Sequence, residues 1–286
     1  MLPLSFFRGP DSFLFPFDPD FFYSNRYDQT STVGNVPARY GHAMANFGFD
    51  NNWIVMFGGR NGTSLDYGSN EKTKLFGDTW LLSSPTLAIG GSWSTLGWST
   101  GKIVSAPEPR WKHAMASLGL GLEQNAPKVV MFGGCRDIEC KNLLADTWVL
   151  TARQNGGGGK NNQLQSPPIW SKINMKSFPS KRRSHAMAFL GMSSGNKALL
   201  FGGACGTGLH PENIQLCNKK DGLTWEFNGT VWTQPMVITS TELSPRYDTT
   251  MAALPVAASS SASLVGGFTL VMLGGKDKNS HEIKGS

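Results

Sequence analysis

The stretch RYGHAMANF, residues Arg39 to Phe47, recurs in altered form three more times along this 286-residue chain. The later copies are RWKHAMASL from Arg110, RRSHAMAFL from Arg182 and RYDTTMAAL from Arg246, so they start about 70 residues apart. All four keep the arginine, a methionine and an alanine, and the fourth has Thr249 where the others have histidine. A repeat of this kind predicts similar structural units arranged side by side.

The segments that follow each copy complete the repeat. An apolar run ends in two glycines at Gly59, Gly134, Gly203 and Gly275, and the first three copies continue with two tryptophan-bearing runs. Short apolar or alternating segments between turn residues are typical of β-strands. In the third copy, Asn228-Gly229 between two such runs predicts a type I′ hairpin turn, in which both residues take positive φ. We therefore expect four antiparallel strands, A to D, in each unit, which is a propeller blade.

Arg-x-x-His before an apolar strand, Gly-Gly after that strand and a spaced pair of tryptophans together resemble the kelch repeat, in the superfamily that contains the central domain of galactose oxidase. The resemblance implies an all-β, kelch-type β-propeller with about three complete blades and a truncated fourth. The expected blades are 37–98, 107–174, 179–236 and 245–275, and the last is incomplete. They lie between an aromatic and proline-rich segment, 1–36, and a tail, 276–286.

Such a set of blades does not close a ring. The chain is then a fragment, which we favour, or the N-terminal segment around Phe21 to Tyr23 supplies a closing strand, or closure needs another chain. Propellers have about four to eight blades.

The repeated residues are expected to be structural. Glycines permit backbone angles closed to other residues, tryptophans fill the space between blades, and the resemblance gives the arginines polar contacts near the blade core. These positions are Arg39, His42, Gly58, Gly59, Trp80, Trp93, Arg110, His113, Gly133, Gly134, Trp148, Trp170, Arg182, His185, Gly202, Gly203, Trp225 and Trp232.

The three histidines, one in each of the first three copies, admit a second interpretation. Strand A is the innermost strand of a blade, so the imidazoles could converge on the axis as in a catalytic zinc site. Against this, the fourth copy carries threonine and no acidic residue recurs nearby as a second ligand shell. We favour structural hydrogen bonding for the histidines, and a core-facing position for the methionines Met44, Met115, Met187 and Met251.

The four cysteines form two local pairs, Cys135 with Cys140 and Cys205 with Cys217, each just after a Gly-Gly. One disulfide in each B–C loop is the favoured interpretation, with free thiols or a four-cysteine zinc site as alternatives. The Asn-Gly-Thr sequons at Asn61 and Asn228 are candidate glycosylation sites. Both features favour an extracellular or secretory location over a cytoplasmic one, and no apolar run is long enough to cross a bilayer.

The composition and the motifs of the chain argue against several classes of function. The net charge of +6 comes from scattered residues, which argues against a nucleic-acid surface. No hydrolase, nucleotide-binding or zinc-protease motif occurs, and no cofactor is expected. We expect a protein-interaction module whose partner binds the loops between strands, with an oxidase- or mutarotase-like enzyme or a small-ligand site at the channel mouth as the alternative. The candidate contact residues in the B–C loops are Arg60, Asp66, Tyr67, Glu71, Arg136, Asp137, Glu139 and His210.

Overall fold

A computed structural model describes most of the repeat region of the chain. The ranges that it describes are 36–47, 53–62, 73–83, 92–95, 106–120, 127–152, 168–191, 195–210, 213–217, 223–235, 244–255 and 268–283. The N-terminal segment, Trp93's side chain, and Asp66, Tyr67 and Glu71 lie outside them. No helix in these ranges is long and apolar enough to span a membrane.

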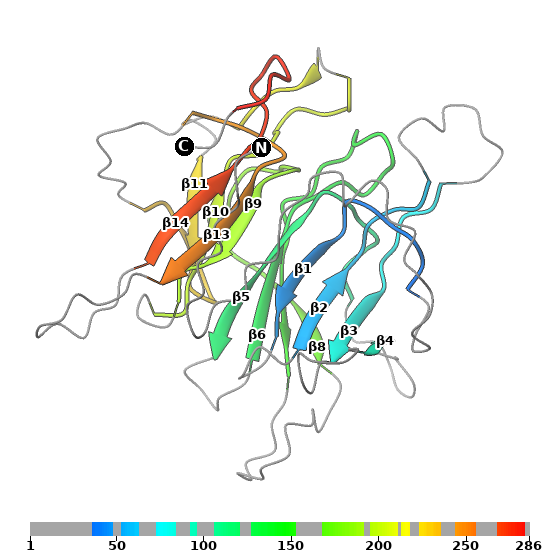
Figure 1. Ribbon diagram of the computed structural model, residues 1–286, viewed down its shortest axis with the longest axis vertical. Coiled ribbons are helices and arrows are strands. Elements are labelled where there is room, and N and C mark those ends of the chain that lie inside the picture. The colour runs from blue at the N-terminus through cyan, green and yellow to red at the C-terminus, as the bar shows by residue number, and fades with distance from the viewer. Residues whose placement is uncertain are drawn as a thin grey trace, which may run out of the picture. The chain divides into compact units, whose positions relative to one another are not determined.

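The described strands form four antiparallel sheets, which we call blades 1 to 4 (Figure 1). Blade 1 contains β1 (Ala43–Asn46), β2 (Trp53–Phe57), β3 (Thr79–Ser83) and β4 (Ser92–Thr95). Blade 2 contains β5 (Ala114–Leu120), β6 (Pro127–Phe132), β7 (Thr147–Thr151) and β8 (Ile169–Ile173). Blade 3 contains β9 (Ala186–Phe189), β10 (Ala198–Phe201), β11 (Thr224–Phe227) and β12 (Trp232–Thr233), and blade 4 contains β13 (Thr250–Pro255) and β14 (Phe268–Leu273).

Each of the first three blades has its strands in chain order, as the repeat predicts. The register is the same at equivalent positions: Met44 pairs with Met56, Met115 with Met131, and Met187 with Leu200. Strand β5 contacts both β1 and β9, and β9 also contacts β13, so the first strands of successive blades are neighbours. The fold is therefore all-β and propeller-like, with β1, β5, β9 and β13 as the inner strands.

Successive blades pack face to face through a repeated apolar interface. Met115 lies in one cluster with Val55 and Phe57 of blade 1, and Met187 lies in another with Val130 and Phe132 of blade 2. Because side chains alternate along a strand, the methionine faces the preceding blade and the flanking alanines face the following one. Each blade thus has a methionine face and an alanine face.

The methionine expectation is met in three copies and wrong in the first. Met115, Met187 and Met251 are 5%, 8% and 8% exposed, whereas Met44 is 43% exposed. The physical reason is the order of the blades: the methionine face packs on the preceding blade, and blade 1 has none before it in the described chain.

The repeated arginines join the strand ends of a blade. Arg110 is fully buried; its guanidinium donates to both carboxylate oxygens of Asp146 at 2.7 and 2.9 Å and to the carbonyl of Gly133. Arg39 makes the same contacts to Asp78 and Gly58. In blade 3, where Leu223 stands in place of that aspartate, Arg182 donates to the hydroxyl of Ser180, and in blade 4 Arg246 donates in the same way to Ser244.

The histidines lie buried at the blade junctions. No hydrogen bond of ordinary geometry reaches a ring nitrogen of His113 or His185 among the described residues, although the backbone of Phe57 and of Phe132 lies close enough to act on the pKa of His113 and His185, respectively. The imidazoles instead pack edge-on against Phe57 and Phe132 of the preceding blades, each with ring centroids 5.7 Å apart. Burial lowers the pKa of His185 to about 3, and the neighbouring Arg182 contributes to that lowering. Neutral imidazoles therefore serve as packing residues.

The hairpin of blade 3 also differs from the prediction. Asn228 does not have positive φ, while Gly229 does, so the turn is not type I′. The side-chain oxygen of Asn228 instead accepts hydrogen bonds from the amides of Thr230 and Val231, both at 3.0 Å. Asparagine commonly closes a turn in this way, through its own side chain.

Candidate functional site

Two B–C loops, 135–143 of blade 2 and, in blade 3, 204–210 with 213–217, form the best-defined candidate surface, which we call the loop pair. Each begins where an inner pair of strands ends in Gly-Gly and continues as irregular backbone. A disulfide closes each loop, between Cys135 and Cys140 and between Cys205 and Cys217, as the sequence predicts. All cysteines of the chain are paired in this way.

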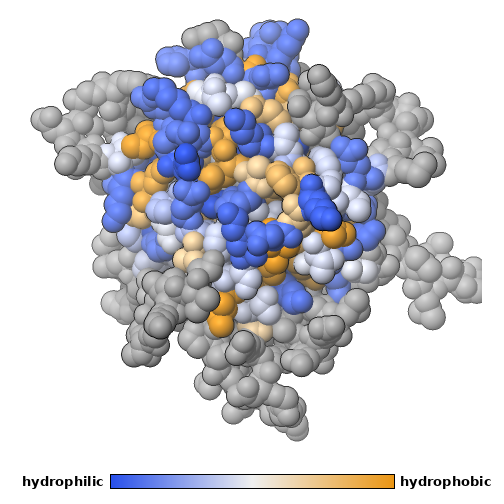
Figure 2. Space-filling view, turned by 180° about the vertical axis from the view of Figure 1, so that it is seen from behind, coloured by the Kyte–Doolittle hydropathy of each residue, from blue (hydrophilic) through white to orange (hydrophobic). Residues whose placement is uncertain are grey.

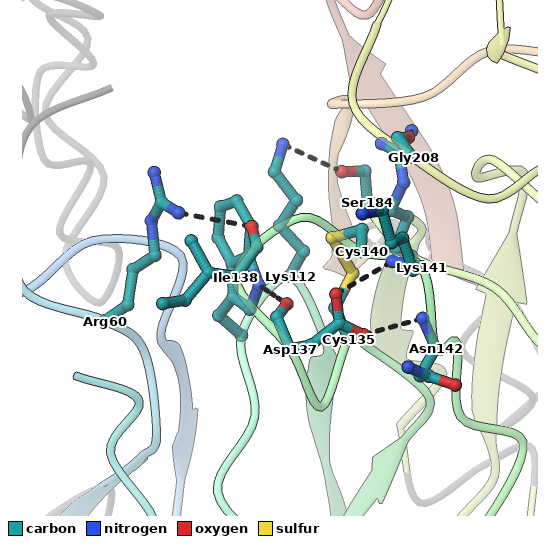
Figure 3. The surroundings of a disulfide bond; sticks show 12 residues. Arg60, Lys112, Cys135, Asp137, Ile138, Cys140, Lys141, Asn142, Ser184 and Gly208 are labelled. Carbon is teal, nitrogen blue, oxygen red and sulfur yellow. Dashed lines mark hydrogen bonds between the residues drawn. A yellow bond between two sulfur atoms is a disulfide. The ribbon is translucent and has the colours of Figure 1, made fainter. Parts of the chain in front are cut away.

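The blade 2 loop is held by hydrogen bonds to its own backbone (Figure 3). The carboxylate of Asp137 accepts from the amides of Lys141 at 2.9 Å and Asn142 at 2.6 Å. The carbonyl of Asp137 accepts from the indole of Trp111 at 2.9 Å. Asp137 thus shapes the loop in addition to being a candidate contact residue, and its side chain is half-buried.

Arg60 lies beneath this loop. Its side chain is 6% exposed; the guanidinium lies 4.2 Å from the ring centroid of Trp111 and 4.7 Å from that of Tyr40. It donates to the hydroxyl of Tyr40 and, at 3.2 Å, to the carbonyl of Ile138. Arg60 therefore supports the loop from below, and its side chain is buried and not at the surface where a partner contact was expected.

The two loops are joined to each other. The amide of Gly208 donates to the carbonyl of Cys140 at 2.9 Å, and Arg183 donates to the carbonyl of Gly208 at 2.6 Å. Leu209 packs against the cluster of Trp111, Cys135 and Cys140. A loop of blade 3 is thereby fixed on blade 2, and the loop pair is one preorganised surface.

The exposed side of the loop pair carries the remaining candidates. Arg136, Glu139 and His210 are exposed, and Glu139 forms an ion pair with Lys141. Ile138 is 37% exposed at the same loop, an apolar side chain among charged ones. Ile138 and Lys141 were absent from the sequence-based candidates, since nothing in CRDIEC distinguishes the outward side chains from those that turn inward.

A polar ring lies beside the loop pair, at the start of the inner strands. Gly41, Lys112, Ser184 and Asp248 all have positive φ, and each amide from Lys112 on donates to the carbonyl of the preceding member at 2.8 to 2.9 Å. The ammonium of Lys112 lies 3.3 Å from the Ser184 hydroxyl and 3.5 Å from the Asp248 carboxylate. The sequence gives little sign of this ring, because its four members are chemically unlike.

The ring itself carries one positive group, Lys112, and one negative group, Asp248, which form an ion pair. Burial lowers the pKa of Lys112; Asp248 opposes this, and Arg183 and Lys276 lower it further. In the described ranges no three histidine, cysteine or acidic side chains are grouped as metal ligands. Arg183 and Lys276 lie close enough to act on Lys112, so the surroundings of the ring carry more positive than negative charge.

Comparison with known proteins adds a fold similarity alone. No family model and no curated protein matches the chain. Solved structures that resemble it include one titled "Structure of YjhT", with 12% sequence identity and a TM-score of 0.35 over 86% of this chain and 80% of that one. These values are too low to bear on function.

Proposed function

We propose that this chain is a kelch-type propeller that binds a partner protein through the loop pair. The observation that carries the proposal is the hydrogen bond from Gly208 to Cys140, which locks two disulfide-closed loops of different blades into one surface. Ordering a loop on binding costs free energy, so a surface fixed in advance binds more tightly. Loops on a rigid scaffold are also where binding residues concentrate.

The chemistry of the surface supports a protein ligand. An exposed apolar side chain, Ile138, lies among Arg136, Glu139 and Lys141, and interfaces commonly have an apolar centre with a polar rim. On the face shown in Figure 2, hydrophobic areas are likewise separated by hydrophilic side chains. The disulfides support an extracellular or secretory location.

The test uses the purified chain as bait for photo-crosslinking in the extracellular fraction of the source cells. A protein recovered by the wild type should be lost with Ile138→Asp and weakened about tenfold or more with Arg136→Glu, since central contacts dominate binding. Ile169→Asp, which alters an exposed apolar residue on an outer strand of blade 2, is the matched control. Equal recovery by all of these baits would refute the proposal.

A second candidate function is binding of a small anion at the ring of Lys112, Ser184 and Asp248. Arg183 and Lys276 add two positive charges beside the ion pair of Lys112 and Asp248, and this is the specific observation in its favour. Titration with phosphate and with a simple carboxylate, followed by NMR shifts of the Ser184 and Asp248 amides, tests it against Lys112→Met. Shifts of the same size in both proteins would exclude the site.

A further inference from the structure

Each blade-to-blade junction in the described chain contains the same backbone hydrogen bond. The second glycine of the Gly-Gly pair donates its amide to the arginine carbonyl of the next blade. The pairs are Gly59 to Arg110 at 2.8 Å, Gly134 to Arg182 at 2.9 Å and Gly203 to Arg246 at 2.8 Å. The carbonyl approaches so closely that a Cβ on the first glycine, at Gly58, Gly133 or Gly202, would lie 2.5 to 2.6 Å from that oxygen.

The fourth Gly-Gly is shaped for this junction, but no described residue fills it. Gly274 and Gly275 have φ of +64° and +99°, against +68° and +94° for Gly58 and Gly59. A Cβ on Gly274 would meet no atom within 4 Å. Gly274 and Gly275 therefore have the backbone conformation of a blade-to-blade junction, although no arginine carbonyl in the described ranges lies beside them.

The alanine face of blade 4 is uncovered in the same way. Leu273 is 50% exposed, while Phe57, Phe132 and Phe201 at the equivalent position are at most 1% exposed. On the same face Leu254 is 44% exposed. In each earlier blade this face is covered by the methionine face of the next one, so the cover that fits blade 4 is another methionine face.

The start of the repeat region carries the matching parts. Met44 is 43% exposed, whereas its counterparts are buried against a preceding blade. The carbonyl of Arg39 corresponds to those of Arg110, Arg182 and Arg246, and among the described residues no backbone donor reaches it. Blade 1 thus presents the surface that blade 4 lacks, and within one copy the two do not meet at Gly274.

We propose that a second copy of this chain docks head to tail, with its blade 1 on blade 4 of the first. The carbonyl of Arg39 accepts from the amide of Gly275, and Met44 packs against Leu273 and Leu254. Because this interface joins two different surfaces, the assembly forms a closed ring of copies only if the rotation from each copy to the next leads back to the first copy. Each copy contributes four blades, so two copies would form a closed propeller at the upper end of the known range of about four to eight blades.

The experiment is light scattering of the full chain during gel filtration, from about 1 to 100 µM, because association depends on concentration. We expect a dimer that becomes a monomer with Leu273→Asp and with Met44→Lys. Gly274→Ala should also give a monomer, since its Cβ would meet the incoming carbonyl. Val231→Asp, at an exposed apolar residue of the blade 3 hairpin, should remain a dimer.

Mixing Leu273→Asp with Met44→Lys gives the sharpest test. A head-to-tail pair would then have one unaltered interface and one in which the introduced carboxylate faces the introduced ammonium, so dimers should return; a face that pairs with itself would not be rescued. A wild-type monomer at all concentrations, or a dimer indifferent to these substitutions, overturns the proposal. Since no variant touches the loop pair, partner binding through Ile138 is decided separately.

Discussion

The indole nitrogen of Trp232 in blade 3 donates a buried hydrogen bond of 2.9 Å to the hydroxyl of Thr147 in blade 2. Trp170 makes the same bond to Thr79 of blade 1 at 3.0 Å. In both junctions the tryptophan also packs edge-on against the phenylalanine that precedes Gly-Gly, Phe132 or Phe57. The last strands of blades 2 and 3 are therefore each fixed to the third strand of the preceding blade, and blades 1 to 3 gain stability from each other.

The first prediction concerns this bond between blades. Thr147→Val keeps the shape of the side chain but leaves the buried indole N–H of Trp232 unpaired, which costs about 1 to 3 kcal/mol. Urea unfolding should show that loss as a lower midpoint. Thr233→Val, at an exposed position of β12, is the control and should change stability by less than about 0.5 kcal/mol. An unaltered midpoint for Thr147→Val would mean that the bond contributes nothing.

The second prediction concerns the ion pair of blade 2. Asp146→Asn leaves the fully buried Arg110 without its counter-charge, and breaking a buried pair in this way costs about 3 to 5 kcal/mol. Ser180→Ala in blade 3 removes only a hydroxyl from Arg182 and should cost about 1 to 2 kcal/mol. Calorimetric unfolding of the two variants should rank them in that order, and the reverse order would contradict the assigned roles.

The same pair predicts a dependence on acid. Burial alone would raise the pKa of Asp146, but the hydrogen bonds and charge of Arg110 outweigh it and hold the pKa below its usual value. A lowered carboxyl pKa adds stability above the pKa of the unfolded chain, about 3.9, which is lost as the pH falls through the folded value. Between pH 5 and pH 2, Asp146→Asn should therefore lose less stability than the wild type.

The third prediction separates the histidines from the carboxylates by pH. His185 has a folded pKa of about 3, below the 6.5 of an unfolded histidine, so the unfolded state binds the proton first. Its contribution is complete above pH 6.5 and falls by about 1.4 kcal/mol per pH unit below it. His185→Leu should reduce the slope of the stability curve by that amount between pH 6.5 and 5, where carboxylates titrate little, while His42 and His113, whose pKa values burial also lowers, keep the remaining slope. A wild-type curve that is already flat there would show that the imidazole can be protonated in place.

Sequence predicted the architecture because the repeat is regular in the residues that make it. Arg39, Gly59 and Trp80 recur with fixed neighbours, and strand order and cysteine pairing followed from that recurrence. Met44 shows where this reasoning fails: it has the repeat's residue type but not its environment, because the burial of one face depends on whether a neighbouring blade exists. Recurrence describes a unit and says nothing of the first or last unit.

The candidate surface was less predictable, for a different physical reason. Loop residues of one charge class can turn inward or outward, and only the backbone path decides which. Arg60 directly follows Gly-Gly and is buried between Tyr40 and Trp111, as Cys135 and Ala204 are buried at the same repeat position, while Arg136, one position further on, is exposed. The repeat distinguishes these two arginines, but beyond that first position the loops differ in sequence, and the repeat gives no guide to which side chains face outward.

The last prediction tests whether the loop pair is one unit. The Cys135→Ser/Cys140→Ser variant should lose about 2 kcal/mol of stability from its short loop, and Cys205→Ser/Cys217→Ser about 3 kcal/mol from its longer one. In the first variant the Gly208 amide, which lies in the other loop, should exchange with deuterium about fivefold faster, because its bond to Cys140 is weakened. The Gly206 amide, bonded at 3.1 Å to Gln215 within its own loop, is the internal control and should stay protected. If the Gly208 amide exchanges no faster in this variant than in the wild type, the loops open independently, and the argument for a single preorganised binding surface fails.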